Sequence, residues 1–207
     1  MNAAQLKLAV TSISDVIAEN KDYLTKLDGQ AGDGDLGISM ASGFKAVCEF
    51  LATADETDLG KLMMKISTVF NETAPSSLGT IISFGMMGMA QSLKGKEDAS
   101  LPEFAAAMKV GVDKIMERAG SKPGEKTILD SLCAGVDTLN ANAGGDKLAA
   151  LKAASEAAHE GSESTKQMRS VHGRAAYFGD KSIGLLDGGS VVGYLIFEAL
   201  YQYASKA

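Results

Sequence analysis

Apolar residues recur at helical spacing along nearly the whole chain, and this periodicity limits the folds that the sequence can adopt. Runs of alternating β-branched residues do not occur. Ser100 and Glu103 form a capping-box pattern at the start of one helical stretch. The sequence therefore predicts an all-α fold of seven or eight antiparallel helices in a single domain, residues 1–207. Eight helices are expected over residues 4–27, 39–53, 59–70, 77–93, 101–119, 125–140, 147–158 and 191–204, with a further helical stretch around residues 162–171.

Glycine-rich segments interrupt the helical pattern, and they are longer than simple turns in a helical bundle need to be. The chain has 23 glycines. Many of them lie in residues 28–37, 120–124 and 172–190. Loops of this kind are where a rigid scaffold places its binding residues. We therefore expect the functional residues in these interruptions.

Three aspartates, Asp28, Asp33 and Asp35, lie within one short segment and are separated by glycines. Three carboxylates held close together repel each other unless a hard divalent cation compensates them, and oxygen ligands suit magnesium or calcium. The glycines leave the backbone free to fold so that the carboxylates converge. The residues alone leave a solvated Asp/Gly turn as an equal alternative.

Two other interpretations of this segment fail on its residues. Residues Gly32 to Gly37 match GxGxxG, but a dinucleotide-binding loop follows a strand, whereas a helix is expected here. An EF-hand loop starting at Asp33 needs Gly at its sixth position and Glu at its twelfth. Ile38 and Phe44 stand at those positions, so the EF-hand interpretation fails.

Hydroxyl and cationic residues elsewhere offer candidate phosphate contacts. Ser76 and Ser77 precede an apolar helix, where hydroxyls and free amides can seat a phosphate, and an ordinary N-cap explains them equally well. Arg174 is a candidate phosphate ligand, with pairing to a neighbouring acid as the alternative. Lys126 follows Glu125 rather than glycine, so its segment is no P-loop. Lys126 either touches a nucleotide or lies in a surface loop.

The composition excludes several classes of function. A net charge of −6 and a pI near 5.0 give no electrostatic footprint for nucleic acid. The sequence has neither a signal peptide nor an apolar run long enough to span a bilayer, so we expect a cytoplasmic protein without a membrane partner. Cys48 and Cys133 lie in apolar helical patterns, which predicts free thiols. Neither His159 nor His172 has the spacing of a hydrolytic triad.

Three blocks in this order resemble the L subunit of dihydroxyacetone kinase, and the resemblance covers essentially the whole chain. The blocks are residues 27–37 (LDGQAGDGDLG), 123–130 (PGEKTILD) and 173–184 (GRAAYFGDKSIG). The resemblance implies an up-and-down barrel of about eight antiparallel helices, with the nucleotide–metal site at one end. It also implies that Asp28, Asp33 and Asp35 hold two Mg²⁺ ions.

The same resemblance implies further contacts with the nucleotide, carried over position by position. These residues are Leu36, Gly37, Ile38, Ser39, Ser76, Ser77, Ile128, Arg174, Asp187, Gly188 and Gly189. Leu36 replaces the family's usual His, and Ser39 replaces an Asn. Residues 74–78 replace a GGASG segment, and Asp187-Gly-Gly replaces Asp-Pro-Gly. The chain therefore looks like a divergent paralogue.

The resemblance also implies a phosphotransferase activity that is shared with other proteins. In the bacterial form, ADP stays bound as a cofactor and is phosphorylated in place by a phosphohistidine protein of the phosphotransferase system. It then passes its γ-phosphoryl group to dihydroxyacetone, or a related short ketose, on a separate sugar-binding K-type subunit. This chain then needs no catalytic side chain of its own. ATP as the direct donor and a homodimer stay open, and the alternative function is a non-catalytic regulatory module that binds magnesium and nucleotide.

Overall fold

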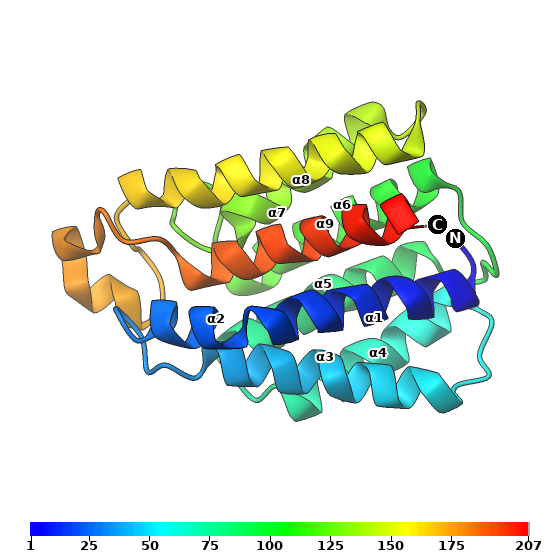
Figure 1. Ribbon diagram of the computed structural model, residues 1–207, viewed down its shortest axis with the longest axis horizontal. Helices are drawn as coiled ribbons and strands as arrows, with labels where there is room; N and C mark the ends of the chain where they lie inside the picture. The colour runs from blue at the N-terminus through cyan, green and yellow to red at the C-terminus, as the bar shows by residue number, and fades with distance from the viewer. Residues whose placement is uncertain (207) are drawn as a thin grey trace.

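Nine α-helices and two 3₁₀ segments form the computed structural model, which describes residues 1–206 (Figure 1). No β-strand forms among these residues, and an isolated bridge joins Asn2 to Asp98. The all-α prediction is therefore confirmed. The helices are α1 (Ala3–Glu19), α2 (Lys21–Asp28), α3 (Leu36–Thr53), α4 (Leu59–Thr73), α5 (Ser77–Ser92), α6 (Leu101–Ala119), α7 (Ile128–Asn142), α8 (Lys147–Ser164) and α9 (Gly188–Lys206), with 3₁₀ segments η1 (Thr165–Gln167) and η2 (Arg174–Ser182).

The helices run alternately up and down and close into a barrel (Figure 1). From α3 to α9, each α-helix packs against the next one along the chain, and α9 returns to pack against α1. Because α9 also packs against α7, α8 covers the outside of that pair. Apolar residues of α1, α3, α4, α5, α6, α7 and α9 line an interior cavity of about 130 Å³. The barrel that the resemblance implies is therefore confirmed.

The connections of the barrel are divided between its two ends. Those between α2 and α3, α4 and α5, α6 and α7, and α8 and α9 gather at one end (Figure 1). Both chain termini lie at the other end. All the glycine-rich interruptions that the sequence singles out therefore meet at the end away from the termini. Within residues 1–206, no helix combines the length and the apolar character that crossing a membrane requires.

Side-chain caps set the start of α6 as the sequence predicts. Ser100 Oγ accepts the N–H of Glu103, and the Glu103 carboxylate accepts the N–H of Ser100 (2.8 Å). Lys96 Nζ lies 2.6 Å from Glu103 Oε1. The hydrogen bond from Lys96, and then those from Ser100, lower the pKa of Glu103 to about 2. The start of α6 is thus stabilised by a carboxylate that must stay charged.

Replacing Glu103 by glutamine should remove an interaction whose strength depends on pH. The pKa of Glu103 in the folded chain, about 2, lies below its ordinary value of 4.5. Its stabilising contribution is therefore fully present above pH 4.5 and is lost as the pH falls towards 2. We expect Glu103→Gln to unfold at a lower urea concentration than the wild type at pH 7, with the difference disappearing near pH 2. Urea titrations followed by circular dichroism measure this, and a difference that grows on acidification would contradict it.

The predicted helix over residues 4–27 is wrong in one respect, because the helix breaks at Asn20. Asn20 has φ −97° and ψ 6°, and its side-chain amide donates to the Val16 carbonyl oxygen (2.8 Å). A side chain that bonds its own main chain in this way competes with the helix. The second piece, α2, then ends at Asp28.

The helices α7 and α9 also begin at residues other than those predicted. α7 begins at Ile128 and not at residue 125, because Lys126 has φ +61°, which lies outside the right-handed helical region. α9 begins at Gly188 and not at residue 191, because Asp187 acts as its cap and accepts the N–H of Ser190 (2.6 Å). Both differences move the helix starts within the loop end of the barrel.

The predicted helix over residues 162–171 is also wrong. α8 continues to Ser164, η1 adds one turn to Gln167, and Met168 is extended with φ −98° and ψ 150°. The glycine-rich segment that follows contains η2, whose turns are interrupted at Gly179 (φ +55°). The chain between α8 and α9 is therefore a long, ordered loop with short helical turns.

Candidate functional site

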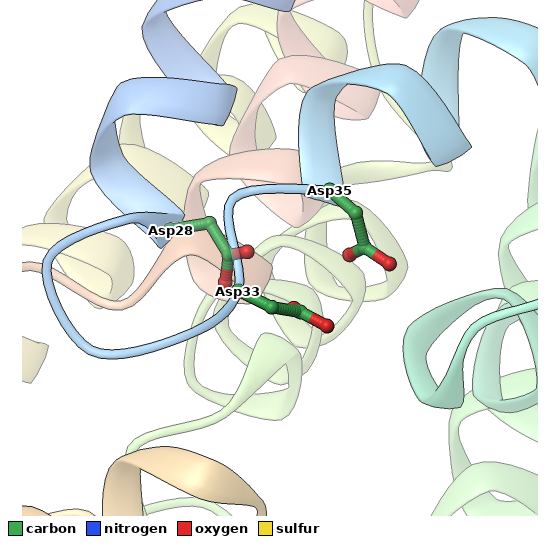
Figure 2. A group of neighbouring side chains, drawn as sticks. All are labelled: Asp28, Asp33 and Asp35. Atoms are coloured by element: carbon green, nitrogen blue, oxygen red, sulfur yellow. The ribbon is translucent and has the colours of Figure 1, made fainter.

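The three aspartates lie at the connection between α2 and α3. Asp28 is the last residue of α2, and the other two lie in the loop that follows (Figure 2). One oxygen from each of Asp28, Asp33 and Asp35 lies within 4.8 Å of the other two. Gly34, at φ +75°, donates its N–H to Asp28 Oδ2 (2.8 Å) and so turns the loop back onto α2. Asp35 occupies the N-cap position of α3 without capping it. The three carboxylates thus form one group with the oxygen chemistry that a divalent cation needs.

Repulsion within this group affects the acidity of Asp35. Partial burial, followed by the negative charges of Asp33 and Asp28, raises the pKa of Asp35, while Arg174 opposes the rise. The guanidinium of Arg174 forms an ion pair with Asp33. The acid that pairs with Arg174 is therefore itself a candidate metal ligand. A divalent cation is a larger local charge than one guanidinium and would relieve the repulsion more completely.

Ser39 and Ser76 connect the first turn of α3 to the start of α5. Ser39 Oγ donates to Ser76 Oγ (2.9 Å), which also accepts the N–H of Gly79 (3.0 Å) as the N-cap of α5. The Ser39 N–H donates to the Asp35 carbonyl oxygen (2.9 Å), which ties this pair to the carboxylate loop. Ser77 is exposed as the first residue of α5. The N–H groups at this helix start have the direction and polarity that a phosphate requires.

The start of α9 lies against the starts of α3 and α7. A Cβ atom at Gly188 would come within 2.6 Å of Leu36 Cδ2, and one at Gly189 would lie 3.4 Å from the Ile128 N. Leu36 is 7% exposed and Ile128 is 2% exposed, so both side chains are buried behind these glycines. Desolvation raises the pKa of Asp187, the cap of α9, to about 7. The structure thus brings these five predicted residues together.

Gly37 and Ile38 belong to the first turn of α3, which begins three residues earlier than the predicted start at residue 39. Gly37 is buried where α3 crosses α2. A Cβ atom there would come within 2.5 Å of Thr25 Oγ1 and closer still to the Lys21 carbonyl oxygen. Ile38 is 52% exposed. Gly37 therefore fixes the loop against α2, while Ile38 faces solvent at the loop end of the barrel.

Sequence reasoning missed the contacts that join the α6–α7 connection to the α8–α9 connection. Lys126 is 5% exposed, so it does not lie in a surface loop, and its ammonium donates to the Thr165 carbonyl oxygen (2.6 Å). His172 Nε2 lies 2.6 Å from Glu125 Oε2, and this hydrogen bond is the largest cause of the lowered pKa of Glu125. The carbonyl partners of Lys126 carry no sequence signal, because every residue has one.

The chain is similar in sequence to known proteins. Residues 30–202 match the family model described as the DAK2 domain. The ADP-binding subunit of the PEP-dependent dihydroxyacetone kinase of Escherichia coli is 28% identical over 192 residues, which cover 92% of this chain and 91% of that protein. The corresponding subunit of a second such kinase, from Listeria innocua, is 27% identical over 210 residues, covering 100% and 97%. The chain thus spans nearly the full length of these bacterial subunits.

Longer proteins contain the same region as a part. The human triokinase/FMN cyclase is 30% identical over 201 residues, which cover 96% of this chain and 35% of that protein. The crystal structure of the dihydroxyacetone kinase of C. freundii matches with a TM-score of 0.75 at 23% identity, covering 97% of this chain and 34% of that one. A second C. freundii structure, in complex with AMP-PNP and Mg²⁺, gives a TM-score of 0.73 at the same identity. The chain belongs to the DAK2 domain family.

Proposed function

We propose that residues 1–207 form one domain that carries ADP or ATP with two Mg²⁺ ions and transfers phosphate to dihydroxyacetone or a related short ketose. The observation that carries this proposal is the convergence of Asp28, Asp33 and Asp35, whose oxygens lie within 4.8 Å of one another. Mg²⁺ is typically held by one or two carboxylates together with phosphate oxygens. The relatives named ADP-binding subunits, and the structural neighbour with AMP-PNP and Mg²⁺, support this identity of the ligand.

In this proposal, different side chains bind the metal ions and the phosphate groups. Asp28, Asp33 and Asp35 hold the metal, while Ser76 and the N–H groups at the start of α5 bind phosphate oxygens. Arg174, which forms an ion pair with Asp33, supplies a planar cation that matches a phosphate. Bound Mg²⁺ neutralises phosphate charge and stabilises the charge that develops during transfer. The remaining nucleotide contacts come from Leu36, Gly37, Ile38, Ser39, Ser77, Ile128, Asp187, Gly188 and Gly189.

Two partners complete the proposed reaction. A separate K-type subunit holds the ketose and activates its hydroxyl, so this chain supplies no proton acceptor. The phosphoryl donor is ATP or, as we favour, a phosphohistidine protein of the phosphotransferase system. The name of a Lactococcus lactis relative, a PTS-dependent kinase subunit 29% identical over 187 residues, supports that donor. Reconstitution with a purified phosphohistidine protein, compared with ATP alone, decides between the two sources of phosphate.

The proposal is tested by the small molecule that the protein carries. Recombinant protein is denatured, and the released compounds are analysed for adenine nucleotides. In parallel, calorimetry measures ADP and ATP binding with Mg²⁺ and with EDTA. We expect stoichiometric nucleotide, or binding that requires Mg²⁺. If no nucleotide is released and none binds at millimolar Mg²⁺, the proposal is wrong.

The second candidate is a regulatory module that binds magnesium and nucleotide without transferring phosphate. It is favoured by Leu36, an apolar side chain that packs beside Gly188 where the family carries a histidine. The two functions agree on binding and differ on transfer. Nucleotide binding together with no transfer to dihydroxyacetone, in the presence of both partners, would select the regulatory module.

A further inference from the structure

Lys126 is a buried cation whose ammonium bonds to three main-chain carbonyl oxygens. Its side chain is 5% exposed. It donates to the carbonyl oxygens of Thr165 (2.6 Å), Met168 (3.3 Å) and Leu185. An ammonium has three N–H donors, so three acceptors use its full capacity. Since burying a cation is costly unless its donors are satisfied, this arrangement requires all three carbonyl groups to stay in place.

The three acceptors enclose one long loop at the site end of the barrel (Figure 1). We call residues 168–185 the clasped loop, because Met168 and Leu185 both bond to the same ammonium. Two further bonds join the sides of its base. The Gly184 N–H donates to the Lys166 carbonyl oxygen (2.7 Å), and the Ser170 N–H donates to Ser182 Oγ (2.9 Å). The base of the loop is therefore closed by polar contacts.

The rest of the clasped loop has little apolar packing to hold it. Tyr177 is 92% exposed, Phe178 is 43% exposed and Ile183 is 50% exposed. A segment that buries little apolar surface opens at low free-energy cost unless other contacts fix it. This loop carries Arg174, whose guanidinium reaches Asp33 in the carboxylate group. The position of Arg174 therefore depends on the bonds at the base of its loop.

The backbone conformation before α7 directs the Lys126 side chain towards the carbonyl oxygens of Thr165, Met168 and Leu185. Lys126 has φ +61°, and it is the one non-glycine residue within residues 1–206 with a positive φ. Asp130 fixes the turn on both sides by accepting the N–H groups of Gly124 and Thr127. Strained backbone of this kind persists where the surrounding structure determines it, and it occurs most often at functional sites.

We propose that Lys126 is a positioning residue for nucleotide binding: by clasping both ends of residues 168–185, it holds Arg174 over the Asp28, Asp33 and Asp35 carboxylates. This inference rests on the proposed function, since Arg174 is placed for a phosphate. The metal ligands lie on the α2–α3 loop, which Lys126 does not touch. Lys126 therefore affects nucleotide affinity without contributing to the metal group itself.

The test compares Lys126→Met with Lys7→Met. Lys7 also donates to a main-chain carbonyl oxygen, that of Ala54, but it lies at the end of the barrel that carries the termini. For Lys126→Met, we expect the dissociation constant for Mg²⁺-nucleotide to rise about tenfold or more, because the closed loop becomes a minor population. The affinity for Mg²⁺ alone should not fall. Lys7→Met should bind nucleotide like the wild type.

A double-mutant cycle with Arg174→Met separates positioning from a general structural defect. If Lys126 acts through Arg174, the double variant Lys126→Met/Arg174→Met should bind nucleotide within about twofold of the weaker single variant. If the losses of affinity in the two single variants multiply in the double variant, the proposal is wrong. An unchanged nucleotide affinity in Lys126→Met would also overturn it. Should Lys126→Met fail to fold, Lys126→Gln, which keeps two N–H donors without the charge, takes its place in the same cycle.

Hydrogen exchange on the ligand-free chain keeps this inference separate from the proposed function. We expect Lys126→Met to lose protection at the Ser170 and Gly184 amides, which donate within the loop base, while the α1 amides keep theirs. If wild-type protein binds no nucleotide, the proposed function fails, and loop protection still decides whether Lys126 is the clasp. Unchanged protection at both amides would overturn the clasp itself.

Discussion

Asp33→Ala should abolish magnesium-dependent nucleotide binding while the helical content stays at the wild-type level. Asp33 supplies one of three carboxylates whose oxygens lie within 4.8 Å, and it is also the ion-pair partner of Arg174. Removing a group that merely orients a metal ligand typically costs 10–100-fold in affinity, so removing a ligand should cost about 100-fold or more. Calorimetry with Mg²⁺ and ADP measures the loss, and far-ultraviolet circular dichroism measures the helices.

The control for this variant is Asp55→Ala. Asp55 is exposed in the connection between α3 and α4, at the end of the barrel away from the carboxylate group. The two variants lose the same charge, so a general effect of net charge would weaken both alike. We expect only Asp33→Ala to lose binding. Nucleotide retained by Asp33→Ala would remove this residue from the metal site.

Gly37→Ala should have the second large effect, because it affects both stability and the site. A Cβ atom at this position would come within 2.5 Å of Thr25 Oγ1 and closer still to the Lys21 carbonyl oxygen. Since these are atoms of α2 and its main chain cannot turn aside, α3 must move away from α2. Overpacking of this kind costs about 1–3 kcal/mol of folding free energy. The shift also separates Asp35, which precedes α3, from Asp28 at the end of α2.

Gly29→Ala is the matched control for that prediction. Gly29 has φ −61°, and a Cβ atom there would lie 3.5 Å from the nearest atom outside its immediate neighbours, an ordinary contact. We expect Gly29→Ala to leave thermal unfolding and Mg²⁺ affinity close to those of the wild type. We expect Gly37→Ala to lower both the unfolding temperature and the affinity for Mg²⁺. Equal stability of the two variants would show that α3 tolerates a side chain against α2.

The fold was predictable because its main signal, apolar periodicity, is local. The buried face of each helix can be predicted from apolar residues that recur three and four positions apart. The capping box of Ser100 and Glu103 likewise predicts where α6 begins. The errors arose where main-chain geometry decides. Asn20 breaks the first helix through a bond to its own backbone, and Lys126 delays α7 through a positive φ. Neither feature changes the pattern of apolar residues.

The candidate site was predictable where its parts lie close in sequence. Asp28, Asp33 and Asp35 stand in one loop, so their convergence could be inferred from the glycines between them. The hydrogen bond between Ser39 and Ser76 joins α3 to α5. It could not be predicted from the sequence, because it depends on how these two helices pack in three dimensions. The buried contacts of Lys126 were missed because carbonyl acceptors are present at every position of a chain.

The arrangement of connections gives the two halves of the site different folding requirements. The three candidate metal ligands come from a single turn between consecutive helices, whereas Ser76 comes from the α4–α5 connection and Arg174 from the α8–α9 connection, which both follow later in the chain. Under the proposed function, a chain that is only partly assembled therefore still brings its three carboxylates together but lacks the complete phosphate-binding site. A ligand that binds only the native state stabilises that state by mass action. Bound nucleotide would therefore raise the stability of fully closed barrels and would not stabilise partly assembled chains.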